Sequence, residues 1–231
     1  MPEITFILND LRGAIFVEDN RDLTAKAVEH LQEHLGEARE VGCARPIEII
    51  KPPIISSEQL TESISVRIAG LYHNSLTEGP GRRSSVLFQY CPLKCKGCWV
   101  ANLHPDAAGV LIPVNRLADE LLDPKYKRDG VTILGGEPFA QPDGLLALVR
   151  ELRSKNCPHI LCYSGYTLEA LRGKAAEQPS IGAVLEEVDV LIDGAYIESL
   201  AGGASLWTGS GNQRVIDLAA TRQSNRIVLY S

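Results

Sequence analysis

Short, uninterrupted apolar segments alternate with helix-like segments along most of this chain. Apolar strands are expected at residues 85–88, 131–134, 159–163 and 189–192. Helices are expected at residues 114–122, 144–154 and 167–172. Continuously apolar strands separated by helices are typical of a parallel sheet covered by helices. The pattern therefore predicts an α/β fold, with the strands forming a partial, open parallel β/α barrel.

Each expected strand ends in residues that suit ligand binding better than packing. In chain order the strands run into Cys91, Gly135–Gly136, Ser164–Gly165 and Asp193–Gly194. The carboxyl ends of parallel strands meet at one edge, and parallel α/β folds carry their functional groups at that edge. We therefore expect these four segments to form one site.

The first 50 residues form a separate pattern, that of a small α/β unit. Strands are expected at residues 4–8, 14–17 and 47–50, and a helix at 22–38. Prolines at 52 and 53, followed by polar residues up to 57, indicate a boundary. We expect an N-terminal α/β extension of unknown role over residues 1–60 and the main domain over residues 61–231.

Composition excludes some classes of partner. The 231 residues carry a net charge of −6, with 45% hydrophobic residues, so no broad electrostatic contact with nucleic acid or anionic lipid is expected. No apolar run approaches the roughly 18 residues of a membrane span, and the N-terminus lacks a signal peptide. These features predict a cytoplasmic protein without a membrane partner. Its six cysteines should then be reduced thiols or metal ligands.

Three of the cysteines lie within eight residues, directly after the first expected strand. Cys91, Cys95 and Cys98 can converge on one inorganic centre, and short spacings between thiolates are typical of iron–sulfur sites. A zinc site is the alternative, and its fourth ligand would be His104 or a distant cysteine such as Cys157 or Cys162. Cys43, Cys157 and Cys162 otherwise have the pattern of ordinary buried thiols.

The Cys-x3-Cys-x2-Cys segment resembles the hallmark of the radical S-adenosylmethionine superfamily. The resemblance implies that Cys91, Cys95 and Cys98 hold a [4Fe–4S] cluster whose fourth iron chelates S-adenosylmethionine. It also implies reductive cleavage of that cofactor to methionine and a 5′-deoxyadenosyl radical. Most members carry an aromatic residue just before the third cysteine, whereas this chain has Gly97 there and Trp99 after it.

The segments at the ends of the later strands extend the resemblance. Gly135-Gly136-Glu137-Pro138 is similar to the family's "GGE" motif, which binds the cofactor's amino group, although a plain strand-to-helix turn would use the same residues. The Ser164 segment is similar to the "TGY" segment of glycyl-radical activases, although a Ser or Thr N-cap of the next helix would use the same residues. Asp193 is suited to a ribose hydroxyl or a substrate contact, and a solvated turn aspartate is the alternative. The implied cofactor-binding residues are Gly97, Trp99, Gly135, Gly136, Glu137, Pro138, Ser164 and Asp193.

Two further segments resemble a narrower group, the activating proteins of anaerobic ribonucleotide reductase. The stretch from Trp207 to Arg214 is similar to their "W-x-G-S-x-N-Q-R" element, and residues 78–82 are similar to their "x-G-P-G-x-R" entry. The resemblance covers residues 63–217 and implies a glycyl-radical enzyme as partner. Asn212, Gln213 and Arg214 are then candidates for contacting that partner.

Rival functions share part of this evidence. The same cofactor could serve modification of a peptide or a small molecule, as in 7-carboxy-7-deazaguanine synthases, with residues 1–60 recognising the substrate. The cysteines could instead belong to a zinc-binding interaction module without catalysis. The activase hypothesis further implies a flavodoxin- or ferredoxin-type electron donor.

Overall fold

The computed structural model describes residues 5–9, 13–17 and 64–230, and the chain divides into two compact units, residues 1–48 and 49–231. In the first unit, β1 (Thr5–Asn9) and β2 (Gly13–Val17) pair antiparallel. Both strands were expected. The helix expected at 22–38, the strand at 47–50 and the boundary at 51–57 lie outside the described residues, and the domain division at residue 60 stays a prediction.

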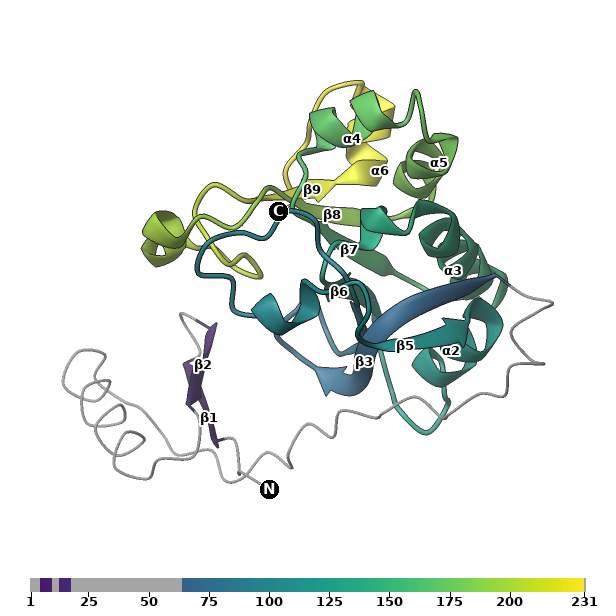
Figure 1. The fold of residues 1–231 in the computed structure, drawn as a ribbon, viewed down its shortest axis with the longest axis horizontal. Helices are drawn as coiled ribbons and strands as arrows, with labels where there is room; N and C mark the ends of the chain where they lie inside the picture. The colour runs from purple at the N-terminus through teal and green to yellow at the C-terminus, as the bar shows by residue number, and fades with distance from the viewer. Residues whose placement is uncertain (1–4, 10–12, 18–63, 231) are drawn as a thin grey trace. The chain divides into compact units, whose positions relative to one another are not determined.

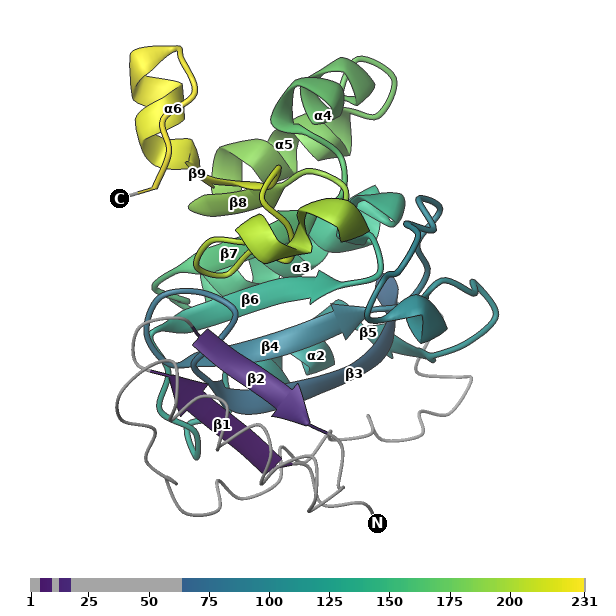
Figure 2. The same ribbon diagram turned by 90° about the vertical axis from the view of Figure 1, so that its left-hand side faces the viewer.

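The second unit is built on one seven-stranded sheet with the order β5-β3-β4-β6-β7-β8-β9 (Figures 1 and 2). Its strands are β3 (Ser65–Ser75), β4 (Arg83–Phe88), β5 (Val110–Pro113), β6 (Gly130–Gly135), β7 (Ile160–Ser164), β8 (Val190–Asp193) and β9 (Arg214–Asp217). The four strands expected from apolar runs are β4, β6, β7 and β8, and they pair parallel to one another.

The α/β class and the parallel pairing of the four expected strands are confirmed, and antiparallel strands that were not predicted extend the sheet on both sides. Strand β3 pairs antiparallel with β4 and with β5, and β9 pairs antiparallel with β8. Within residues 64–230, no α-helix lies between β3 and β4 or between β8 and β9, and strands joined by a loop alone can pair antiparallel. The fold is therefore a mixed α/β structure whose central four strands are parallel.

The helices cover one face of this sheet, as Figures 1 and 2 show. They are α2 (Val114–Leu121), α3 (Pro142–Ser154), α4 (Leu168–Lys174), α5 (Pro179–Glu187) and α6 (Leu218–Ser224), with short 3-10 turns η2 (Ala101–Leu103), η3 (Pro138–Ala140) and η4 (Glu198–Gly203). The three expected helices correspond to α2, α3 and α4. No helix in the described part of the chain is long and apolar enough to cross a bilayer.

Alternation along the central strands divides their side chains between two apolar clusters. Val131, Ile133, Cys162 and Leu191 belong to the large core that includes the buried side chains of α2, α3 and α5. Leu161, Val190 and Ile192 form a second cluster with Tyr163, Trp207, Val215 and Tyr230 packed against it. Since residues that alternate along a strand point to opposite faces, the second cluster lies on the face away from the helices.

Arg83, the first residue of β4, is fully buried and connects the segment before β4 to strand β6. The guanidinium of Arg83 donates to the hydroxyl of Thr132 at 2.5 Å and to the carbonyl oxygens of Val131 and Pro80 at 2.6 and 3.1 Å. Burial lowers the pKa of Arg83 from its usual value. These bonds join residues 78–82, the segment that resembles the activase entry motif, to the amino end of β6.

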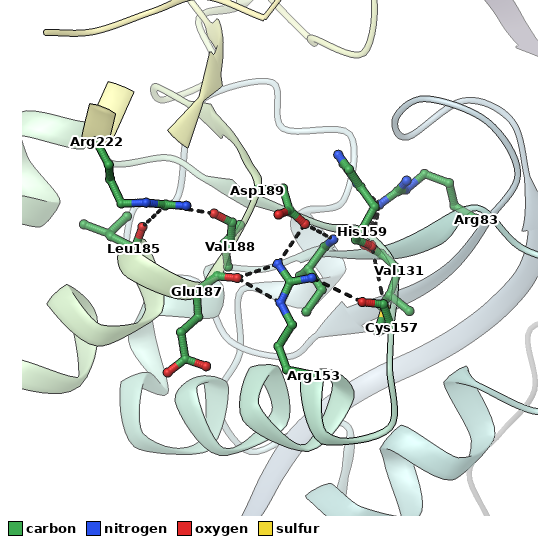
Figure 3. Close-up of polar contacts among 11 residues, drawn as sticks. Arg83, Val131, Arg153, Cys157, His159, Leu185, Glu187, Val188, Asp189 and Arg222 are labelled. Carbon is green, nitrogen blue, oxygen red and sulfur yellow. Dashed lines mark hydrogen bonds and ion pairs between the residues drawn. The ribbon is translucent and has the colours of Figure 1, made fainter. Parts of the chain in front are cut away.

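Two more arginines donate hydrogen bonds to backbone carbonyls at the edge where the parallel strands begin (Figure 3). Arg153 of α3 donates to the carbonyl of Glu187 at 2.6 Å and to the carboxylate of Asp189 at 2.8 Å, and Arg222 of α6 donates to the carbonyl of Leu185 at 2.8 Å. Carbonyls that end helix α5 thereby find partners. These bonds stabilise the edge at which the parallel strands begin. The motif segments lie at the opposite edge, where those strands end.

Arg83→Lys should lower the free energy of unfolding by about 2–4 kcal/mol, because one ammonium cannot reproduce the fork of donors and leaves buried acceptors unpaired. Arg82→Lys is the matched control: the Arg82 side chain is exposed, so its change should stay within about 0.5 kcal/mol. Urea unfolding followed by circular dichroism measures both. Equal stabilities of the two variants would contradict the assigned role of Arg83.

Candidate functional site

Four loops meet at the carboxyl edge of the parallel strands. Phe88 at the end of β4 is in register with Gly135 at the end of β6, and Ser164 at the end of β7 is in register with Asp193 at the end of β8. The segments singled out in the sequence therefore follow neighbouring strands at one edge. Parallel pairing, as opposed to proximity in the chain, gathers them.

The loop after β4 carries the three clustered cysteines. Cys91 is buried, whereas Cys95 and Cys98 are partly exposed. Tyr90 donates its N–H to the carbonyl of Leu103 at 2.9 Å, and Cys98 donates to the carbonyl of Cys95 at 3.3 Å. Three residues of this loop have a positive φ, and they are Tyr90, Lys94 and Gly97. The loop is therefore tightly coiled and is closed at its base by its own backbone.

The donor set of this loop fits an iron–sulfur cluster. All three cysteines are free thiols, and thiolates are the ligands that such clusters require. Burial raises the pKa of the Cys91 thiol, so a bound metal centre would have to displace its proton. Between residues 64 and 230 no three cysteine, histidine or carboxylate side chains already stand together as a metal-binding group. The fit thus rests on the donor chemistry of Cys91, Cys95 and Cys98, the residues that would hold the cluster.

The additional ligands considered for zinc lie in different surroundings. Cys157 and Cys162 are buried in the main core, and burial raises the pKa of both thiols. His104 lies beside the cysteine loop, since its carbonyl accepts the N–H of Cys91 at 3.4 Å. Its Nε2 atom is buried and has no hydrogen-bond partner in the described structure.

The loop after β6 is bonded to the start of the cysteine loop. Gly136 donates its N–H to the carbonyl of Phe88, and Glu137 donates to the carbonyl of Tyr90, both at 2.8 Å. A Cβ atom added at Gly136 would lie 2.2 Å from the carbonyl oxygen of Tyr90. Glycine is therefore required here by the close approach of two backbones, which is a stronger constraint than a turn imposes.

Glu137 is fully buried, and its carboxylate is already hydrogen-bonded. One oxygen accepts from the N–H of Phe139 and the hydroxyl of Ser164, both at 3.0 Å, and the other accepts from the N–H of Gly165 at 2.8 Å. Burial raises the pKa of Glu137 to about 7, against the lowering effect of these donors. Pro138 is also buried and begins η3.

The second half of the cysteine loop contacts the segment after β8. A Cβ atom at Gly97 would lie 2.6 Å from the carboxylate of Glu198, and Lys96 pairs with the same carboxylate at 3.6 Å. The ring of Trp99, which is 73% exposed, lies 6.0 Å from that of Tyr196. Glu198 thus lies close to Gly97, whose positive φ of 72° favours glycine at this position.

Asp193 is fully buried at the end of β8. Its carboxylate accepts from the N–H of Leu168 at 2.7 Å and from Nε of Arg214 at 2.9 Å. Arg214 also binds Glu169 through two bonds, at 3.1 and 2.7 Å, and this pairing lowers the pKa of Glu169 to about 2. The ion-pair network fixes the amino end of α4 beside β8 and β9.

The other residues of the C-terminal motif hold the loop after β8. Asn212 donates to the carbonyl of Ala195, and Gln213 donates to the carbonyl of Gly194, both at 2.8 Å. The side-chain oxygen of Gln213 accepts from the N–H of Gly209 at 2.7 Å. Asn212, Gln213 and Arg214 therefore have partners within the chain, and their expected contact with another protein stays a prediction.

Sequence reasoning did not identify several residues that shape this edge. Leu93 covers Gly165, Glu198 faces Gly97, and Glu169 binds Arg214. The contacts of Glu198 with Gly97 and of Glu169 with Arg214 join residues far apart in the sequence, so no local pattern predicts them. The position of Leu93 between the first two cysteines of the motif is the sequence feature that could have indicated its role.

Comparison with known proteins identifies the relatives of this chain. The family model described as "4Fe-4S single cluster domain" matches residues 77–216. The anaerobic ribonucleoside-triphosphate reductase-activating protein of Haemophilus influenzae is 32% identical over 149 residues, which are 62% of this chain and 92% of that protein. The protein of the same name from Escherichia coli K12 is 29% identical over 154 residues, 62% of this chain and 94% of its own length.

A more distant activating enzyme matches a shorter part of the chain. The pyruvate formate-lyase-activating enzyme of Clostridium pasteurianum is 31% identical over 104 residues, 43% of this chain and 44% of that enzyme. Activating enzymes with different named targets are thus similar to this chain. The chain belongs to the radical S-adenosylmethionine superfamily, among the glycyl-radical activating enzymes that include the activating proteins of anaerobic ribonucleoside-triphosphate reductase.

Proposed function

We propose that this protein generates a glycyl radical on an anaerobic ribonucleotide reductase, using S-adenosylmethionine and a [4Fe–4S] cluster held by Cys91, Cys95 and Cys98. When bound, the cluster supplies one electron that cleaves S-adenosylmethionine to methionine and a 5′-deoxyadenosyl radical, which removes a hydrogen atom from the partner's glycine. A flavodoxin- or ferredoxin-type protein is the proposed electron donor.

The observation that carries this proposal is the junction between the loops after β4 and β6. The N–H groups of Gly136 and Glu137 donate to the carbonyls of Phe88 and Tyr90, which both precede Cys91, at 2.8 Å each. A cofactor that must contact both a metal centre and a glycine-rich loop needs those loops at a fixed spacing. Similarity to reductase-activating proteins over 62% of the chain supports the choice of partner.

The remaining loops would bind and orient the cofactor. Backbone groups of Gly135 and Gly136 can approach a ligand closely because no side chain shields them. Ser164 and Asp193 lie in register at the ends of β7 and β8 and would border the cofactor's ribose and methionine portions. We further propose that the mixed sheet is the partial barrel of the superfamily, and that Gly97, Trp99 and Pro138 line its open end.

Gly136→Ala should displace the cysteine loop, because the added carbon would overlap the carbonyl oxygen of Tyr90. We expect a loss of about 1–3 kcal/mol in stability and a reduced iron content after anaerobic reconstitution. Gly173→Ala is the control, since a Cβ atom there meets nothing within 4 Å and the residue lies in α4. It should retain its iron and gain up to about 1 kcal/mol in stability. Normal iron content in Gly136→Ala would mean that the glycine serves only a turn.

The proposed activity predicts a glycyl radical after anaerobic incubation of the reduced protein with S-adenosylmethionine and the anaerobic ribonucleotide reductase of the same source. Electron paramagnetic resonance should record the doublet of a glycyl radical on the reductase. Methionine and 5′-deoxyadenosine should accumulate, and Cys95→Ala should abolish all three signals.

Two other results have defined meanings. Cofactor cleavage without a glycyl signal would favour a peptide or small-molecule substrate over the reductase. Stoichiometric zinc and no cleavage, in protein made with ample iron, would reject the radical chemistry and favour a zinc-binding module.

A further inference from the structure

The carboxylate of Glu137 is committed to holding loops together in the protein without cofactor. Its three donors come from two segments: Phe139 belongs to the turn after β6, Ser164 is the last residue of β7, and Gly165 follows it. The side chain is 0% exposed. A buried carboxylate with both oxygens bonded offers little to a ligand at the surface, because any new bond would have to replace one of these.

The same residue reaches the cysteine loop through two further contacts. Its backbone N–H binds the carbonyl of Tyr90, the residue before Cys91, at 2.8 Å. Gly165, which donates to the carboxylate, is covered by Leu93: a Cβ atom at Gly165 would lie 2.2 Å from the Leu93 methyl carbon. The backbone of Glu137 therefore contacts the start of the cysteine loop at Tyr90. Its side chain is connected to the middle of that loop through Gly165, which lies against Leu93.

We propose that Glu137 is a positioning residue, whose side chain joins the loops after β4, β6 and β7 into one unit before any cofactor binds and does not itself contact S-adenosylmethionine. The assignment deepens the proposed function, since it concerns the same site. It differs from the role that resemblance alone implies for this glutamate. Preorganised loops bind and orient a ligand without first having to be ordered, which favours affinity.

The test compares Glu137→Gln with wild type in anaerobically reconstituted full-length protein before S-adenosylmethionine is added. A glutamine keeps the size of the side chain but replaces one acceptor oxygen with an amide nitrogen, so one of the three donors loses its partner. Hydrogen exchange measured by mass spectrometry should become about tenfold faster or more in the peptides that contain Gly165 and Leu93. Glu177→Gln, the same change at an exposed position, should leave both peptides unaltered.

A second measurement separates positioning from direct binding. The dissociation constant of S-adenosylmethionine, read from the change it causes in the paramagnetic resonance spectrum of the reduced cluster, should rise about tenfold in Glu137→Gln. Ser164→Ala, which removes one donor, should raise it less. In the exchange measurement, made without cofactor, the double variant should exchange no faster at Gly165 than Glu137→Gln alone, because both changes break the same connection.

Several outcomes would overturn the inference. Normal exchange with weakened cofactor binding would make Glu137 a direct ligand, and normal values of both would deny it any role at the site. If Glu137→Gln does not fold, Ser164→Ala decides: faster exchange at Gly165 supports the connection, and unchanged exchange rejects it. The exchange measurement does not require cofactor binding. Failure of wild-type protein to bind S-adenosylmethionine would therefore count against the proposed function alone.

Discussion

The pair of backbone hydrogen bonds from Gly136 and Glu137 to the carbonyls of Phe88 and Tyr90 is the contact on which the candidate site depends. It ties the loop after β6 to the entry of the cysteine loop at a point where no side chain can stand between them. Parallel pairing of β4 with β6 brings the strand ends level, and the glycine lets them touch. This contact fixes the chain up to Tyr90, the residue before Cys91.

Buried carboxylates extend the same organisation along the edge. Glu137 links the loops after β6 and β7, and Asp193 links β8 to the amino end of α4 and, through Arg214, to β9. Each lies at the carboxyl end of a parallel strand and accepts backbone N–H groups that would otherwise be unpaired. Charged groups are costly to bury unless they are bonded in this way. The edge is thus rigid at its base, while Trp99 and Lys96 remain exposed at its rim.

The sequence predicted the centre of the fold better than its margins. Strands β4, β6, β7 and β8 are recognisable because continuous apolar runs suit strands buried on both faces. Strand β3 escaped prediction because its 11 residues mix Arg67, His73 and Asn74 with apolar positions and contain two register shifts. The motif residues could be located from sequence, but the bonds of Glu137 and Arg214 join positions 21 to 45 residues apart and depend on the folded sheet.

In the proposed function, the three cysteines of one loop hold a four-iron cluster with one iron left for S-adenosylmethionine. Mössbauer spectroscopy of protein reconstituted with iron-57 tests it most directly, because that method distinguishes individual iron sites. We expect a [4Fe–4S] spectrum in which a single iron of the four changes its parameters when S-adenosylmethionine is added. A spectrum in which no iron responds to the cofactor, or protein that binds zinc and no cluster under these conditions, would contradict it.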